Sequence, residues 1–72
     1  MGEVYNTILD SLSNGGYLET DGVFHWWVND GEYNVIDKEI FMEFIKHKIV
    51  YGKRIDDDTT CYYIYPKKML IK

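Results

Sequence analysis

Residues 23–36 have the sequence VFHWWVNDGEYNVI, which is the clearest β-hairpin signal in the chain. Residues 23–28 are β-branched or aromatic at every position except His25, and such residues are enriched in strands. Residues 29–32 (Asn-Asp-Gly-Glu) form a strong turn signal, and residues 33–36 then provide the return strand. The sequence therefore predicts a hairpin with an aromatic first strand.

Both faces of this aromatic strand are largely apolar, because successive side chains of a strand point to opposite faces. One face carries Phe24, Trp26 and Val28, and the other carries Val23, His25 and Trp27. Either the hairpin is covered on both sides, or one face is an exposed surface. If the first set forms core, Trp27 lies beneath a helix; otherwise Trp27 is available to a partner.

Two amphipathic helices are expected on either side of the hairpin. Over residues 3–13 an apolar residue recurs at every fourth position, and the Asn-Gly-Gly of residues 14–16 ends the predicted helix. Asp37 is a good N-cap for a second helix over residues 38–50, which has a broad apolar arc.

The other expected strands are short. Residues 17–19 are extended, residues 53–55 lead into the polar loop 56–60, and residues 61–65 form the returning strand before Pro66. The tail, residues 67–72, could add one more short strand. The sequence therefore predicts a single globular domain, residues 1–72, of the α+β class. It has two layers and the order helix, β-hairpin, helix, β-hairpin.

The segment from Ile36 to Tyr65 combines an N-capped helix, a glycine, a basic strand, a polar loop and an aromatic strand. In this order it resembles the recognition helix and wing of winged-helix proteins, over about half of the chain. The resemblance implies a DNA-binding regulator whose second helix enters the major groove and whose wing contacts phosphates.

Composition limits the compartment and indicates an origin. One cysteine, Cys61, excludes an internal disulfide and indicates a reducing environment, and no apolar run approaches the ~20 residues of a membrane span. We therefore expect a cytoplasmic protein. The chain contains no Ala and no Gln, and it has seven Lys but one Arg. In this composition it resembles the products of bacteriophage or mobile-element genes.

Charge is divided unevenly along the chain. Residues 1–37 carry seven acids and no Lys or Arg, a formal charge of −7, whereas residues 38–72 carry five acids and eight bases, a formal charge of +3. An acidic surface steers encounters with basic partners. We therefore predict a small binding protein that inhibits or modulates a host nucleic-acid-handling protein. The predicted contact residues are acids and aromatics of the first half: Tyr17, Glu19, Asp21, Trp27, Asp30, Glu32 and Tyr33.

Two alternatives belong to other classes. The first is the winged-helix-like DNA-binding regulator, which would use Lys46, His47, Lys53, Arg54, Lys67 and Lys68. Glu39 and Glu43 on the exposed helix face and a sequence pI near 4.9 argue against it. The second alternative is a homodimer formed through the aromatic hairpin.

No catalytic, cofactor or metal signature is recognisable in the sequence. The three aspartates of residues 56–58 lack the alternating spacing and closing Glu of a calcium loop. His25, His47 and Cys61 do not have zinc-ligand spacing. We predict that the protein is not an enzyme and uses no cofactor.

Overall fold

The structure, a computed structural model, describes residues 2–66 and contains two helices and five strands. The elements follow one another along the chain as α1 (Glu3–Ser13), β1 (Tyr17–Thr20), β2 (His25–Asn29), β3 (Glu32–Val35), α2 (Lys38–Lys46), β4 (Val50–Arg54) and β5 (Thr60–Ile64).

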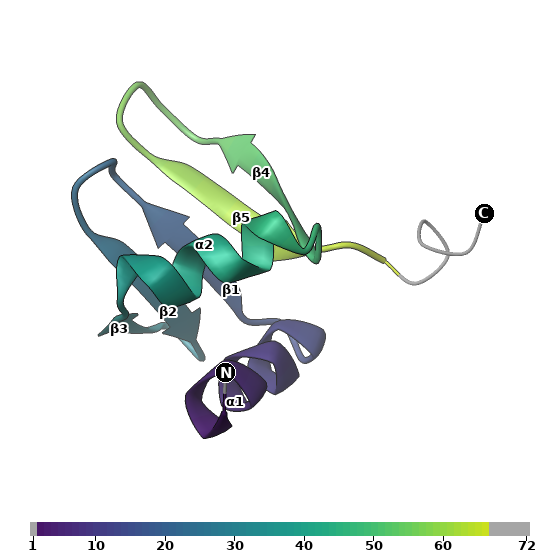
Figure 1. The fold of residues 1–72 in the computed structure, drawn as a ribbon. Coiled ribbons are helices and arrows are strands. Elements are labelled where there is room, and N and C mark those ends of the chain that lie inside the picture. The colour runs from purple at the N-terminus through teal and green to yellow at the C-terminus, as the bar shows by residue number, and fades with distance from the viewer. Residues whose placement is uncertain (1, 67–72) are drawn as a thin grey trace.

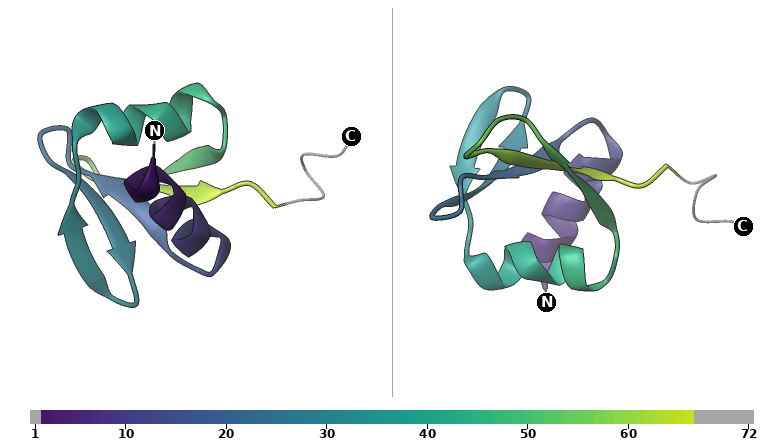
Figure 2. Two further views of the ribbon diagram at one scale, coloured as in Figure 1. Left: turned by 60° about the horizontal axis from the view of Figure 1, so that its bottom comes forward. Right: turned by 90° about the horizontal axis from the view of Figure 1, so that it is seen from above.

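The five strands form one antiparallel sheet with the order β3-β2-β1-β5-β4. β1 lies at the centre of the sheet and joins the β2–β3 hairpin to the β4–β5 hairpin, as Figure 1 shows. Both helices pack on the same side of the sheet (Figure 2). The α+β prediction is therefore confirmed, and the opposite side of the sheet is covered by no element of residues 2–66.

The core lies between the helices and the sheet. Its buried residues come from both helices and from strands at the centre and edge of the sheet: Ile8, Leu12, Leu18, Phe41, Phe44 and Val50. Tyr5 of α1 stacks on Phe44 of α2 with ring centroids 4.3 Å apart, so the two helices also contact each other. Burial of large aromatic side chains offsets much of the conformational entropy that a small domain loses when it folds.

The aromatic strand begins two residues later than predicted, at His25 instead of Val23. The reason is the turn that precedes it, where the backbone N–H groups of Val23 and Phe24 both donate to Asp21 Oδ1, each at 2.8 Å. An Asp side chain that bonds its own backbone two residues on offers the chain an alternative to a strand ladder. The following turn is as predicted, with Asp30 and Gly31 at φ 52° and 80°.

The second helix ends at Lys46, four residues before the predicted end at residue 50. Lys48 has φ 58°, its N–H donates to Ile45 O at 3.0 Å, and the Ile49 N–H donates to Phe44 O at 3.1 Å. This is the Schellman pattern of a helix C-terminus. Consequently β4 begins at Val50, three residues earlier than the strand predicted at residue 53.

The start of α2 also differs in detail. Asp37 occupies the N-cap position as predicted, but its side chain forms no capping hydrogen bond, and its carbonyl accepts the Phe41 N–H at 3.1 Å. The strand suggested for residues 67–72 lies outside the described residues. The winged-helix order is not confirmed, because β1 precedes the first hairpin and is built into one continuous sheet.

Candidate functional site: the open face of the sheet

Two rows of side chains run across the face of the sheet that points away from the helices, called here the open face. The first row, called the tyrosine row, crosses all five strands and contains, from β3 to β4, Tyr33, Val28, Tyr17, Tyr63 and Tyr51. Val28 pairs with both Tyr33 and Tyr17, Tyr17 packs on Tyr63, and Tyr63 pairs with Tyr51. The ring centroids of Tyr17 and Tyr63 are 5.5 Å apart, and those of Tyr51 and Tyr63 are 5.9 Å apart.

The second row, called the Glu19 row, lies beside the tyrosine row. In order of the strands β3 to β4 it contains Val35, Trp26, Glu19, Cys61 and Lys53. Aromatic contacts join the rows, since the Trp26 ring meets Tyr33 edge-on at 6.1 Å. Phe24 extends the surface beyond Trp26, and Tyr65 extends it beyond Tyr51.

This face is apolar and largely accessible to solvent. Val35 is 71% exposed, Phe24 is 56% exposed and Tyr33 is 55% exposed. Single exposed apolar residues are normal on a protein surface, but a contiguous group of them is unusual. Of the residues in the two rows, only Val28 and Cys61 are buried. Large rigid rings with few rotatable bonds are the side chains that most often anchor protein interfaces.

Glu19 places one carboxylate in the middle of the rings. Its Oε1 accepts the Tyr33 hydroxyl at 3.1 Å and the Cys61 thiol at 3.7 Å. The Tyr17 hydroxyl and then the Glu19 carboxylate favour the protonated phenol, and they raise the pKa of Tyr33 to about 12. Burial first and the Glu19 charge second raise the pKa of Cys61, so the thiol stays protonated and is a poor nucleophile at neutral pH.

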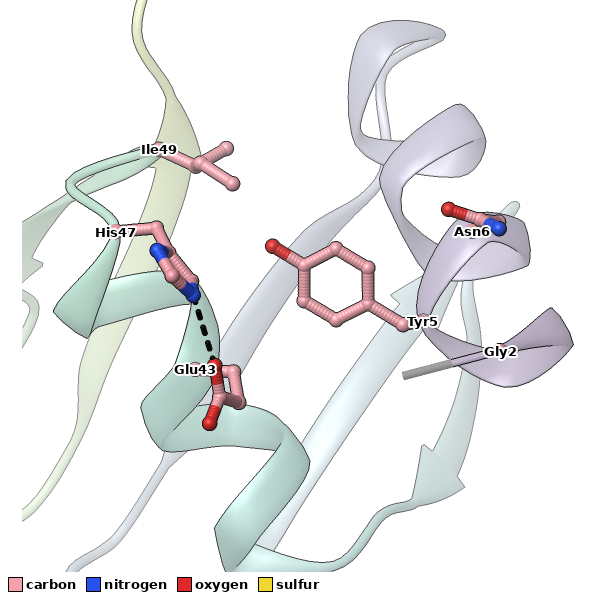
Figure 3. A pocket seen from close by; sticks show the side chains of 6 residues that line it. All are labelled: Gly2, Tyr5, Asn6, Glu43, His47 and Ile49. Atoms are coloured by element: carbon pink, nitrogen blue, oxygen red, sulfur yellow. Dashed lines mark hydrogen bonds and ion pairs between the residues drawn. The ribbon is translucent and has the colours of Figure 1, made fainter.

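A second feature is a hollow of about 590 Å³ between the two helices, shown in Figure 3. The residues that line it are Gly2, Tyr5, Asn6, Glu43, His47 and Ile49. The Tyr5 ring projects from α1 toward α2, where His47 Nε2 lies 2.9 Å from Glu43 Oε1.

The chemistry available in this hollow is limited. Partial burial first and the Glu43 carboxylate second raise the pKa of Tyr5, so its hydroxyl stays protonated. The lining contains no Ser, Thr or Cys that the His47–Glu43 pair could activate. Within residues 2–66 no group of three or more His, Cys, Asp or Glu side chains is placed to hold a metal ion.

Of the aromatic residues predicted to contact a partner, the structure brings Tyr17 and Tyr33 together with Glu19 on the open face. The expectation that Trp27 is an exposed aromatic is wrong. Trp27 packs against the core on the helix side of the sheet, and its indole N–H donates to Ser11 Oγ at 2.9 Å. The Trp on the open face is its neighbour, Trp26.

The other predicted acids do not gather around this surface. Asp21 lies in the β1–β2 turn at one end of the sheet, whereas Asp30 in the β2–β3 turn and Glu32 at the start of β3 lie at the other end. Asp56 and the two aspartates that follow it occupy the β4–β5 loop, beside the Asp21 turn (Figure 1). The acids are therefore divided between the two ends of the sheet and the open face.

The predicted basic residues are also separated. Lys46 and His47 lie at the end of α2 on the helix side, whereas Lys53 belongs to the Glu19 row on the open face. Arg54 donates to the carbonyls of Asp56 and Asp57 at 3.2 and 3.1 Å, so it closes its own loop. Lys67 and Lys68 lie outside the described residues.

Several residues of the open face were not predicted as contacts, notably Trp26, Tyr51 and Tyr63. For Tyr63 the sequence contains a partial signal, because Tyr63 and Tyr65 alternate with Tyr62 and Ile64 along the predicted strand 61–65 and therefore share one face. What the alternation does not show is which of the two faces the helices cover.

Comparison with protein-family models, with curated proteins and with solved structures finds no match to this chain. Neither helix within residues 2–66 is both long enough and apolar enough to cross a membrane.

Proposed function

We propose that this protein is a non-enzymatic binding module that holds a partner protein on the open face of its sheet. The observation that carries the proposal is the pair of aromatic rows, which no helix or strand of residues 2–66 covers. Water contact with so many rings is unfavourable, and a partner that covers them gains roughly 25 cal/mol for each Å² of apolar surface buried, before the entropy of association is subtracted.

Charge favours a protein partner over a nucleic acid. Aromatic sheet faces can also stack unpaired bases, but such sites combine the rings with a positively charged groove for the backbone. Here the Glu19 row has Glu19 at its centre and only Lys53 as a cation, and the whole chain has a formal charge of −4. A polyphosphate backbone would be repelled at the middle of this surface.

The partner in this proposal is a host protein that handles nucleic acids, and the module inhibits or modulates it in the host cytoplasm. Such proteins have basic grooves, and the carboxylates at both ends of the sheet would meet them with complementary charge. The phage-like or mobile-element-like composition supports the same setting. A DNA-binding regulator and a homodimer are the alternatives that the experiments distinguish.

The test measures binding to the partner with a matched pair of substitutions. A partner captured from the host lysate is purified, and its affinity is measured by calorimetry for the wild type, Val35→Lys and Met42→Lys. Val35 is 71% exposed on the open face and Met42 is 44% exposed on α2, so both substitutions add the same charge at an exposed apolar position. We expect Val35→Lys to weaken binding about tenfold or more, and Met42→Lys to leave it unchanged.

Two results would contradict this function. One is an equal effect of both substitutions, which would place the contact elsewhere. The other is specific DNA binding that falls steeply with salt and is lost in the double variant Lys53→Ala with Arg54→Ala, which would assign the DNA-binding alternative. Sedimentation at two concentrations tests the homodimer, because self-association that Val35→Lys abolishes would mean that the open face binds a second copy.

A further inference from the structure

Glu19 is the most unusual residue of the open face. It lies half-buried on the central strand, with Trp26 on one side of it in the row and Cys61 on the other. Within residues 2–66 no Lys or Arg forms an ion pair with it, and its two hydrogen-bond partners, Tyr33 and Cys61, are both neutral. Within residues 2–66 the carboxylate therefore lies beside aromatic side chains and has no cation as a partner.

A partner that covers the open face must also cover this charge. Removing an ionised carboxylate from water is strongly unfavourable unless a cation or several hydrogen-bond donors replace the water. Two neutral donors already bind Oε1, and no donor from residues 2–66 binds Oε2. A partner with an apolar group at this place would leave the second oxygen buried without a bond.

The rings around Glu19 favour the same type of ligand. The faces of Trp and Tyr rings attract cations through their quadrupoles. Trp26 pairs directly with Glu19 across β1 and β2, and the Tyr33 ring is held against both, edge-on to the Trp26 ring and hydrogen-bonded to Glu19. A cation placed over the carboxylate therefore has aromatic surface beside it.

We propose that Glu19, Trp26, Tyr17 and Tyr33, called here the Glu19 slot, receive an arginine side chain of the partner protein. The proposal rests on the proposed function, because it names the group that the open face recognises. Arginine is favoured over lysine because its planar guanidinium bonds a carboxylate through two N–H groups and stacks on aromatic rings. Nucleic-acid-handling proteins have abundant arginine in their binding grooves, which agrees with the partner class above.

The test uses two synthetic peptides and needs no identified partner. One is acetyl-Gly-Arg-Gly-amide, and the other replaces arginine with citrulline, which has nearly the same shape and no charge. Each peptide is titrated into the ¹⁵N-labelled protein while the indole N–H signals of both tryptophans are followed by NMR. The Trp27 indole is bonded to Ser11 on the other face, so it reports on the integrity of the fold and not on the slot.

We expect the arginine peptide to shift the Trp26 indole signal saturably and the Trp27 signal little. The citrulline peptide should bind about tenfold more weakly. Glu19→Gln should weaken binding of the arginine peptide by a similar factor, whereas Glu39→Gln, which removes the same charge from an exposed position of α2, should not.

The inference is overturned if the two peptides bind equally, if Glu19→Gln binds the arginine peptide as well as the wild type does, or if no saturable shift occurs. Failure here is distinguishable from failure of the proposed function. If a purified partner loses affinity for Val35→Lys but not for Glu19→Gln, the arginine inference is wrong, and the open face is still the surface that binds the partner.

Discussion

At the scale of single residues, Lys48 is the position where the chain departs most from its intrinsic preference. It adopts φ 58°, a left-handed conformation in which an L side chain crowds its own backbone. The helix accepts this strain because it satisfies two terminal carbonyls of α2, those of Phe44 and Ile45. Glycine is the usual residue at this position of a Schellman motif.

Replacing Lys48 with glycine should therefore stabilise the protein. The left-handed strain disappears, while the added freedom of the unfolded chain offsets part of the gain, so we expect the free energy of unfolding to rise by about 0.5–1 kcal/mol. Urea denaturation measures the change. Lys46→Gly, two residues earlier and inside the helix, is the control and should lower stability by about 1 kcal/mol. A loss of stability in Lys48→Gly would show that the lysine side chain contributes more than the strain removes.

The hydroxyl of Tyr33 predicts a pH dependence in the alkaline range. Its pKa is raised from 10.0 to about 12 by the Tyr17 hydroxyl first and the Glu19 carboxylate second. Because the folded protein holds this proton more tightly than the unfolded chain does, the stabilisation is complete below pH 10 and is lost as the pH rises through about 12. NMR titration of labelled tyrosines should show that the Tyr33 ring titrates late, and Glu19→Gln should bring its pKa closer to the ordinary value. A Tyr33 signal that titrates with the freely exposed tyrosines would contradict the hydrogen bond.

At the scale of elements, a short chain of hydrogen bonds attaches α1 to the sheet. Trp27 Nε1 donates to Ser11 Oγ, which donates to Asn29 Oδ1, both at 2.9 Å. Gly16 lies against the same place, because a Cβ there would come 2.2 Å from Ser11 Oγ and 3.1 Å from the Val28 carbonyl oxygen. The helix therefore depends on a glycine that lets the chain pass close to its last turn.

Ser11→Ala should break this attachment. It leaves the half-buried indole N–H of Trp27 without its acceptor, which costs about 1–2 kcal/mol. Thermal unfolding and the chemical shift of the Trp27 indole proton measure the two effects. Ser13→Ala, in the same helix but exposed and bonded only to the Leu9 carbonyl, should change stability little. Equal destabilisation by the two substitutions would contradict a specific role of the indole contact, since helix propensity alone favours Ala over Ser at both positions.

The elements themselves were largely predictable from the sequence, and their ends were not. The apolar periodicity of residues 3–13 and the Asn-Gly-Gly that follows predicted α1 at its observed bounds. Asp30-Gly31 predicted the hairpin turn. The early end of α2 was not foreseen, because Lys48 is not a residue that usually adopts a left-handed conformation. The late start of β2 was not predicted either, because it depends on the hydrogen bonds that the Asp21 side chain accepts from the backbone, and strand propensities do not include such bonds.

At the scale of the whole molecule, the order of the strands determines where the charges lie. The strands of the acidic first half, β1 to β3, lie together on one side of the sheet, and β4 and β5 of the basic second half lie on the other side, where β5 pairs with β1. Pairing of β1 with β5 joins residues some forty positions apart, and local pattern carries no information about it. The sequence therefore placed Tyr17, Glu19 and Tyr33 among the candidate contacts, but it could not show that Trp26 and not Trp27 lies beside Glu19.

The two faces of the sheet should consequently respond differently to substitution. Leu18 is fully buried on the central strand between both helices and the sheet, and Leu18→Ala should lower the free energy of unfolding by about 2–5 kcal/mol. That is a large part of the about 4–11 kcal/mol expected for a chain of 72 residues, so this variant should be partly unfolded at physiological temperature. Val35→Thr on the open face, where the side chain is 71% exposed, should change stability by less than about 0.5 kcal/mol. Denaturant titration of both variants measures the difference. A comparable loss from Val35→Thr would mean that the open face is part of the protein's own core, and its rings would then be needed for folding and not for a partner.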